Sequence, residues 1–207
     1  MCFCASASFA ASAGLAVVGA ASIKLSKRGE RLFAIVPLLF AVQQFIEGNQ
    51  WMVSHPSIAS LVLGYAFLFF AFLLWPVYIP LAVYQLETDP RNKTVFKWLF
   101  GAGAVTSFAL LVALLSKPLS ISLLTNSIDY RIVTPLGWIG VLLYLAATCG
   151  PLTISSHPRI RWFGAAVTLA IIFSGWFYRT TFISVWCFFS AILSALIFLF
   201  YYKRRYG

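Results

Sequence analysis

Seven apolar stretches, separated by short polar connections, run along the chain. Each holds about 20 residues, which is the length a helix needs to cross the hydrocarbon core of a bilayer. The predicted spans are residues 5–25, 32–54, 58–85, 95–116, 135–155, 160–178 and 181–202. The pattern predicts an all-α integral membrane protein, a seven-helix bundle that forms a single transmembrane domain over residues 1–207.

Lys and Arg residues gather on alternate connections. Twelve of the 15 lie in the first, third and fifth connections and in the C-terminal tail, whereas the other connections hold only Lys117, Arg131 and Arg179. Cytoplasmic segments of membrane proteins are enriched in Lys and Arg. We therefore predict an N-terminus outside the cytoplasm, a cytoplasmic C-terminus, and a basic cytoplasmic face that contacts anionic lipids.

The composition agrees with a chain embedded in the lipid bilayer. Hydrophobic residues make up 61% of the chain, charged residues only 10%, and the mean hydropathy is +0.91. Soluble domains carry about 25% charged residues. The net charge of +10 follows from the cytoplasmic bias of Lys and Arg. No base-stacking motif accompanies the basic residues, so we expect no nucleic-acid partner.

The end of the third span carries two prolines, Pro76 and Pro80, beside Trp75 and Tyr78. Proline removes a backbone donor and favours a kink in a helix, and Trp and Tyr anchor helices at the lipid headgroups. We expect a bent, anchored helix here. The alternative is a hinge or a ligand wall.

The longest external loop spans residues 117–134. Apolar and polar residues alternate on both sides of Thr125-Asn126-Ser127, and alternation around a turn is typical of a β-hairpin. We therefore predict a short hairpin or an ordered lid over the outer face.

Glu47 is the only acidic residue inside a predicted span. An ionisable side chain in the membrane is usually paired, protonated or functional. Helical geometry places it on one face with a group of mostly polar neighbours: Gln43, Gln44, Gln50, Trp51 and Ser54. Lipid cannot satisfy these groups, so the face must look into the bundle. It forms either an interhelical hydrogen-bond network with a neutral Glu47 or a ligand, proton or metal site.

The predicted topology places Cys2, Cys4 and Cys187 in the same outer layer as Glu47, with His55 and Arg179 at the rim. Three interpretations stay open. Cys187 forms a disulfide with Cys2 or Cys4; the thiolates bind Cu or Zn together with Glu47 or His55; or the cysteines are small hydrophobic residues. Cys149 lies near the inner end and is expected to pack.

Common catalytic signatures are missing from the chain. No phosphate-binding glycine loop, dinucleotide-binding motif, zinc-protease motif or nucleophile elbow is present. The two histidines, His55 and His157, fall on opposite sides, which excludes a haem held by both. No Lys lies in the interior of a predicted span, where it could bind retinal, so the seven-helix count does not imply a rhodopsin.

The N-terminal Met1-Cys2-Phe3-Cys4-Ala5 is similar to the start of a family of uncharacterised bacterial membrane proteins, which begin Met-Cys-Phe-Ser-Ala. The similarity continues over nearly the whole chain, through Pro37-Leu38-Leu39-Phe40, Gln43-Gln44-Phe45-Ile46-Glu47-Gly48, Trp75-Pro76 and Val185-Trp186-Cys187-Phe188-Phe189. The resemblance implies an integral protein of the bacterial inner membrane. It also implies that six of the residues discussed above belong to the family pattern: Cys2, Gln43, Gln44, Glu47, Trp51 and Cys187.

The chain departs from the family at two places. Cys4 replaces the family's Ser, and the external loop reads Asn126-Ser127-Ile128-Asp129-Tyr130 where the family has histidines. The missing histidines argue against a metal site of the family's kind.

Three hypotheses follow. The first is a ligand-, metal- or redox-binding site in a polar pocket that opens outward, built from Gln43, Gln44, Glu47, Gln50 and Trp51. The second is an accessory or scaffold subunit that binds partner membrane subunits. The third is a transporter of protons or small solutes.

Overall fold

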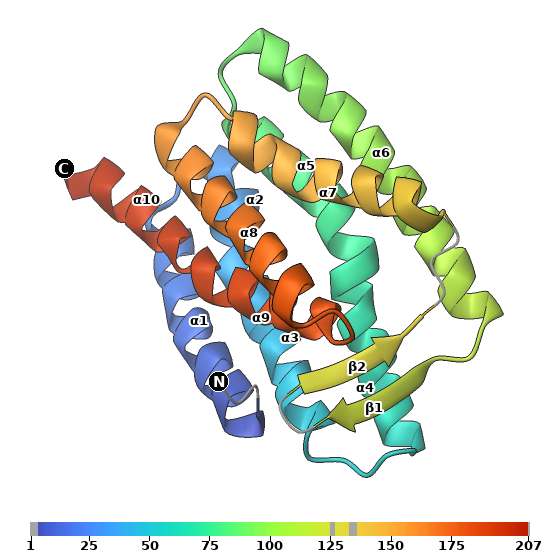
Figure 1. Cartoon of the computed structure of the whole chain (residues 1–207). Helices are drawn as coiled ribbons and strands as arrows, with labels where there is room; N and C mark the ends of the chain where they lie inside the picture. The colour runs from blue at the N-terminus through green and yellow to red at the C-terminus, as the bar shows by residue number, and fades with distance from the viewer. Residues whose placement is uncertain (1–3, 125–126, 133–135, 207) are drawn as a thin grey trace.

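Helices dominate the fold. The computed structural model describes residues 4–124, 127–132 and 136–206. Within them, seven helices are long and apolar enough to cross a membrane, which confirms the predicted all-α bundle (Figure 1). Their bounds are Ala5–Leu25, Arg28–Gln50, Ile58–Leu86, Pro90–Ser116, Gly137–Ile154, Pro158–Phe177 and Phe182–Tyr206.

Three of the spans are composite. The second joins the 3-10 turn η1 (Arg28–Glu30), α2 (Arg31–Ala34) and α3 (Val36–Gln50). The third joins α4 (Ile58–Leu68), the π-helical η2 (Phe69–Leu74) and α5 (Trp75–Leu86). The last joins α9 (Phe182–Ser194) and α10 (Leu196–Tyr206). The others are α1 (Ala5–Leu25), α6 (Pro90–Ser116), α7 (Gly137–Ile154) and α8 (Pro158–Phe177).

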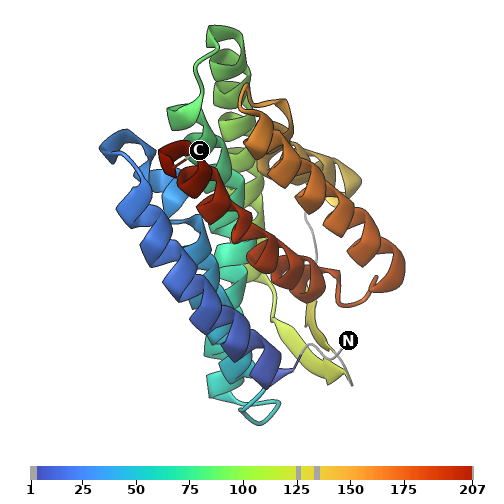
Figure 2. The same ribbon diagram turned by 90° about the vertical axis from the view of Figure 1, so that its left-hand side faces the viewer.

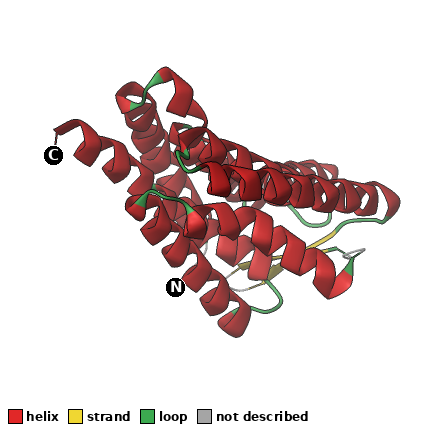
Figure 3. Cartoon of the chain, turned by 90° about the horizontal axis from the view of Figure 1, so that it is seen from above, coloured by secondary structure: helices red, strands yellow, loops and turns green. Residues whose placement is uncertain are grey.

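Successive crossings give the bundle two ends. One end holds the start of α1, the α3–α4 connection and a β-hairpin, and we call it the hairpin end (Figures 1 and 2). The other holds the α5–α6 and α7–α8 connections and the C-terminus, and we call it the basic end because most Lys and Arg residues lie there. Figure 3 shows the strands at one side of the molecule, away from the C-terminus.

The loop between the fourth and fifth spans folds as the predicted hairpin. β1 (Ser120–Leu124) and β2 (Ser127–Arg131) are antiparallel, with Ile121 opposite Tyr130 and Leu123 opposite Ile128. These cross-strand apolar pairs stabilise one face of the ribbon. The turn residues 125–126 lie outside the described residues. β1 contacts α4 and β2 contacts α9, so the hairpin joins two spans that are far apart in sequence.

The irregularity of the third span lies one turn before the position expected from its prolines. Pro76 has no N–H and its ring crowds the preceding turn, which the wider π-helical turn of η2 accommodates. Nearby side chains satisfy the carbonyls of this turn, as is usual within membranes. The Tyr144 hydroxyl donates to the Ala71 carbonyl, and the Ser107 Oγ lies 3.1 Å from the Leu73 carbonyl oxygen.

Small residues allow close helix packing, as expected where no hydrophobic effect drives helices together. A Cβ atom on Gly19 of α1 would lie 2.8 Å from the Leu38 backbone nitrogen of α3. The Ser12 hydroxyl donates to the Ala41 carbonyl at 2.8 Å between the same two helices. Gly103 of α6 lies against the Pro76 carbonyl, which Pro80 has no N–H to satisfy.

Glu87 ties two connections together at the basic end. Its carboxylate accepts hydrogen bonds from the backbone N–H groups of Thr88, Asp89 and Ser156 and from the Ser156 hydroxyl. Burial opposes ionisation, but these donors outweigh it and lower the pKa of Glu87 to about 2. The α5–α6 and α7–α8 connections are therefore held to one another by a buried carboxylate.

Candidate functional site

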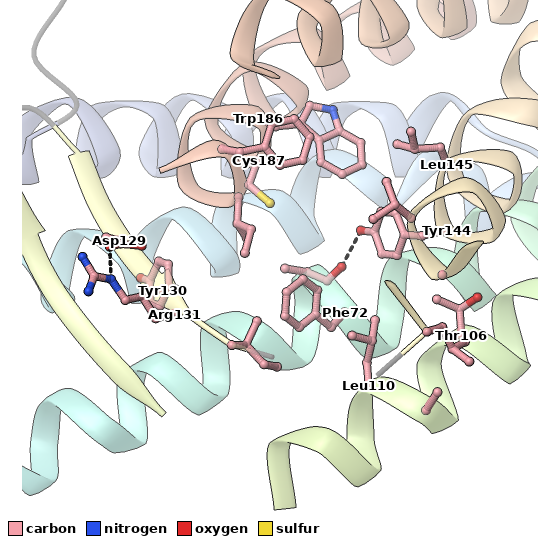
Figure 4. Close-up of a pocket in the computed structure, with 18 of the residues that line it drawn as sticks. Phe72, Thr106, Leu110, Asp129, Tyr130, Arg131, Tyr144, Leu145, Trp186 and Cys187 are labelled. Atoms are coloured by element: carbon pink, nitrogen blue, oxygen red, sulfur yellow. Dashed lines mark hydrogen bonds and ion pairs between the residues drawn. The ribbon is translucent and has the colours of Figure 1, made fainter. Parts of the chain in front are cut away.

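A cavity of about 530 Å³ lies at the hairpin end, between η2, α6, α7 and α9 and beneath β2 (Figure 4). Its inner wall is mainly apolar and aromatic, with Phe72, Leu110, Leu145 and Trp186 contributing. Ligand pockets in proteins usually have volumes of roughly 300–1,000 Å³ and apolar walls with a few placed polar groups.

The π-helical turn forms one wall of the cavity. Ala71 and Phe72 of η2 line it, and so does Tyr144, whose hydroxyl holds the Ala71 carbonyl. The ring of Tyr144 also packs edge-on against Trp186, with 5.6 Å between ring centroids. The prolines that interrupt the third span thus shape a wall, which favours the ligand-wall alternative for this segment over a simple membrane anchor.

β2 covers the cavity. Tyr130 stacks on Phe67 with 4.7 Å between ring centroids, and this contact fixes the strand over α4. Burial, with a smaller contribution from the nearby Glu47 carboxyl, raises the pKa of Tyr130 well above its ordinary value, so its hydroxyl keeps its proton. The buried carboxylate of Asp129 accepts from Arg131, with 2.7 Å between Oδ2 and Nε.

The polar face of α3 is packed behind the cavity and does not line it. The Gln44 Nε2 donates to Glu47 Oε2 at 3.2 Å, and the Ser184 hydroxyl donates to Glu47 Oε1. Gln43 Oε1 accepts from the Trp75 indole at 2.9 Å, and Gln50 Nε2 lies 2.9 Å from the Ser60 hydroxyl. These bonds join α3 to α4, α5 and α9, as an interhelical network would.

Several buried polar atoms around this network have no protein partner among the described residues. They are Gln43 Nε2, Gln44 Oε1, Gln50 Oε1, His55 Nδ1, Tyr130 Oη and, deeper in the bundle, Trp186 Nε1, Ser174 Oγ and Ser190 Oγ. Buried polar groups are normally satisfied by protein or by ordered water. The arrangement therefore has hydrogen-bonding capacity for internal water or a polar ligand group. Tyr130 and Trp186 also line the cavity.

A model of a family of unknown function (DUF6629) matches residues 1–207. The chain belongs to this DUF6629 family. The finding confirms the predicted membership of an uncharacterised family, while the bacterial origin and the shared motifs stay predictions. No curated protein and no solved structure matches the chain.

The polar residues that the sequence predicts to form a pocket divide into two groups. Gln43, Gln44, Glu47 and Gln50 are buried together on α3, but none of them lines the cavity. Trp51 and Ser54 do not extend this face as predicted, because α3 ends at Gln50 and the chain turns there. Trp51 is half-buried and Ser54 is exposed.

The two predicted rim residues, Arg179 and His55, lie in different surroundings. Arg179 lines the cavity and is exposed. His55 instead contacts Gln50, with 2.9 Å between His55 Nε2 and Gln50 Nε2.

The cysteines that the structure describes do not form a metal cluster with Glu47 or His55. Among the described residues, no group of three or more His, Cys, Asp or Glu side chains has a metal-binding arrangement. Cys187 is buried and lines the cavity, and the Cys4 Sγ lies 3.2 Å from the Ser6 Oγ. Cys2 lies outside the described residues, so its predicted role is untested. Cys149 packs in the main apolar core, which confirms the prediction for it.

Sequence reasoning missed most of the cavity wall. The missed residues include Thr106, Leu110, Tyr144 and Trp186. Each lies inside a long apolar stretch, where no sequence pattern separates a residue that lines a cavity from one that packs against other side chains. The usable signal was the hairpin, since an ordered lid over an apolar bundle leaves space beneath it.

Proposed function

We propose that this protein is a membrane-embedded binding protein for a small, largely apolar molecule, held in the cavity beneath β2. The observation that carries the proposal is the cavity itself, with its volume of about 530 Å³. Its lining residues come from the part of the bundle next to the hairpin end, which suits storage or sensing of a ligand better than conduction from one end of the bundle to the other.

The wall chemistry supports this proposal. Apolar and aromatic side chains supply the buried contact area that binds an apolar ligand. Tyr130 and Trp186 each add a hydrogen-bonding atom that has no protein partner in the described part of the chain. Such groups fix the orientation of a ligand and give selectivity.

We further propose that the hairpin end faces the outside of the cytoplasmic membrane of a bacterium. The support is the segregation of Lys and Arg toward the basic end. In that orientation the cavity receives its ligand from the outer leaflet or from outside the cell, and the basic end contacts anionic lipids.

A cavity-filling substitution tests the proposal. A panel of neutral apolar compounds is screened for a rise in the melting temperature of the purified protein, because a ligand that binds only the folded state stabilises it. Ala109→Phe should abolish the response, since Ala109 lines the cavity. Val105→Phe, on the same helix but 57% exposed and outside the lining, is the matched control and should keep it. Equal responses of the two variants would refute the proposal.

Glu47 favours a second candidate, proton or small-solute transport. It is buried, is held by Ser184 and Gln44, and has neighbouring polar atoms without protein partners. Reconstituted protein should then carry protons into liposomes and a Glu47→Gln variant should not. A wild-type protein that carries no protons into liposomes would rule out this candidate function.

The accessory-subunit, disulfide and metal hypotheses have no support among the described residues, where Cys187 carries a free thiol, and they remain predictions only. Thiol counting and elemental analysis of the purified protein address the last two through Cys2, Cys4 and Cys187. The accessory-subunit hypothesis is addressed by isolating the protein from its native membrane and determining whether a stable partner protein accompanies it.

A further inference from the structure

We propose that the ligand of this cavity is an anionic amphiphile, in which a carboxylate or phosphate group is attached to an apolar chain. The inference rests on the proposed function and adds the chemical class of the ligand. Its basis is the distribution of charge around the mouth of the cavity.

All three cations of the hairpin end gather around the cavity. Arg131 and Arg179 line the cavity itself. Lys117 lines a neighbouring hollow of about 240 Å³, which adjoins the cavity because the two share Arg131 and Ile132. Lys and Arg are depleted on the non-cytoplasmic side of membrane proteins. Topology alone therefore does not explain why the three cations of this side are placed together.

An acidic side chain balances one of these three cations, Arg131, but not the other two. Asp129 pairs with Arg131 through the 2.7 Å contact between Oδ2 and Nε. Lys117 and Arg179 are both exposed and form no ion pair within the described ranges, 4–124, 127–132 and 136–206. Glu47, the other carboxyl group toward this end, is buried beneath and bound by Ser184 and Gln44. The rim thus carries a net positive charge.

The interior beneath this rim is apolar. Phe72, Leu110 and Leu145 line it, and Trp186 contributes an aromatic face. A charged group is excluded from such surroundings by its desolvation cost, whereas an alkyl chain gains from leaving water. A positive rim above an apolar chamber therefore complements a ligand with its charge at one end. A wholly apolar molecule would leave the cations unused, and a free inorganic anion would leave the chamber empty.

The test compares three probes that share one alkyl chain and differ in the headgroup: dodecanoate, dodecyl phosphate and dodecanol. Binding to the full chain in nanodiscs of zwitterionic lipid is measured by calorimetry at pH 8, where the carboxylate probe is ionised. We expect both anions to bind more tightly than dodecanol, and raised salt to weaken only the anions. The comparison of the two anions distinguishes a fatty-acid ligand from a phosphate-bearing one.

Variants assign the headgroup position. Arg179→Gln and Lys117→Gln should each weaken anion binding by roughly two- to fivefold, the range expected for an exposed ion pair, and leave dodecanol unchanged. Arg161→Gln, an exposed cation of the basic end, is the control and should have no effect. Arg131 is left intact because its removal would strip buried Asp129 of its partner.

The outcomes separate the two proposals. Equal affinity for dodecanol and the anions, or no effect of Arg179→Gln and Lys117→Gln, overturns the anionic headgroup while the cavity remains a binding site. Binding of all three probes that is unaffected by Ala109→Phe places them elsewhere, and the proposed function then fails as well. Val141→Phe, at an exposed position of the cavity lining, replaces Ala109→Phe if that variant does not fold.

Discussion

Two buried glutamates show how differently a carboxyl group can be accommodated in this protein. Glu47 is buried among the helices toward the hairpin end and relies on two side chains, Ser184 and Gln44. Glu87 lies at the basic end and relies mainly on backbone N–H groups. Backbone donors are fixed in position by the fold, and they supply three of the four hydrogen bonds to the Glu87 carboxylate, the fourth coming from the Ser156 hydroxyl.

The pH dependence of stability should therefore include Glu87. Its pKa is about 2 in the folded chain and 4.5 as an ordinary value, so its stabilisation is present above about pH 4.5 and is lost as the pH falls toward 2. Glu87→Gln should lower the melting temperature at pH 7 by roughly 2–4 °C, the effect of about 1 kcal/mol in a chain of this size.

Melting curves of both proteins in detergent at pH 7 and pH 3 provide the measurement. The gap between variant and wild type should narrow at pH 3, because other carboxylates titrate in both proteins and cancel in the comparison. A gap that is constant with pH would show that Glu87 contributes nothing through its charge.

At the residue scale, the sequence indicates the burial of Glu47 but carries no signal for that of Glu87. A lone carboxylate in an apolar run must be buried, so its place in the sequence is informative. Glu87 stands in a polar connection and resembles a solvated residue. Its partner Ser156 is 69 residues away, and no local pattern reveals the pairing.

At the scale of elements, close packing of the third and fourth spans depends on one glycine. Gly103 of α6 lies against the Pro76 carbonyl of α5, and a Cβ there would also meet Ala147 of α7 at 3.2 Å. Gly101 lies two residues away on the same helix and has open space around its Cβ position. The two glycines therefore lie on the same helix but differ in how closely other helices pack against them.

Gly103→Ala should lower the free energy of unfolding by about 1–3 kcal/mol, because the added methyl group forces α6 away from α5. Gly101→Ala should change it by less than about 0.5 kcal/mol, as is usual for surface positions. Thermal or denaturant unfolding in detergent measures both. Similar losses in the two variants would mean that contact with Pro76 does not set the effect, since helix propensity alone favours Ala at both positions.

Prediction of the elements was most accurate where the sequence shows a regular alternation of apolar and polar residues, or an apolar run of the length that a bilayer requires. The seven spans follow from runs long enough to cross a bilayer, and the hairpin from alternation around Asn126. The prolines indicated that the third span is irregular, but the π-helical turn lies at residues 69–74, ahead of them. Its position depends on Tyr144 and Ser107 from other helices, which satisfy the carbonyls that it leaves open.

At the scale of the whole molecule, the two ends of the bundle differ in charge and in construction. The basic end carries most of the Lys and Arg residues, and the C-terminal helix is joined there to the first connection by Arg204 and Glu30. The hairpin end carries the cavity and three cations. The orientation that we propose makes a direct prediction about which end reacts with a reagent outside the cell.

A cysteine at each end tests the orientation, in a background where Cys2 and Cys4 are replaced by serine. Met52→Cys, at a highly exposed position of the hairpin end, should react with a membrane-impermeant maleimide in intact cells. Arg91→Cys, exposed at the basic end, should react only after the membrane is permeabilised. The reverse pattern would invert the proposed topology.

The contact between Ser184 and Glu47 joins residues that are 137 positions apart, and this separation bears on biogenesis. Chains are made and inserted from the N-terminus, so the carboxyl group enters the membrane long before the hydroxyl that binds it. The cavity likewise lacks a wall until α9 arrives. An insertion intermediate that contains only the first six spans therefore lacks the Glu47 partner Ser184 and one wall of the cavity. Insertion of the last span is the step at which membrane quality control can first distinguish a finished protein from an incomplete one.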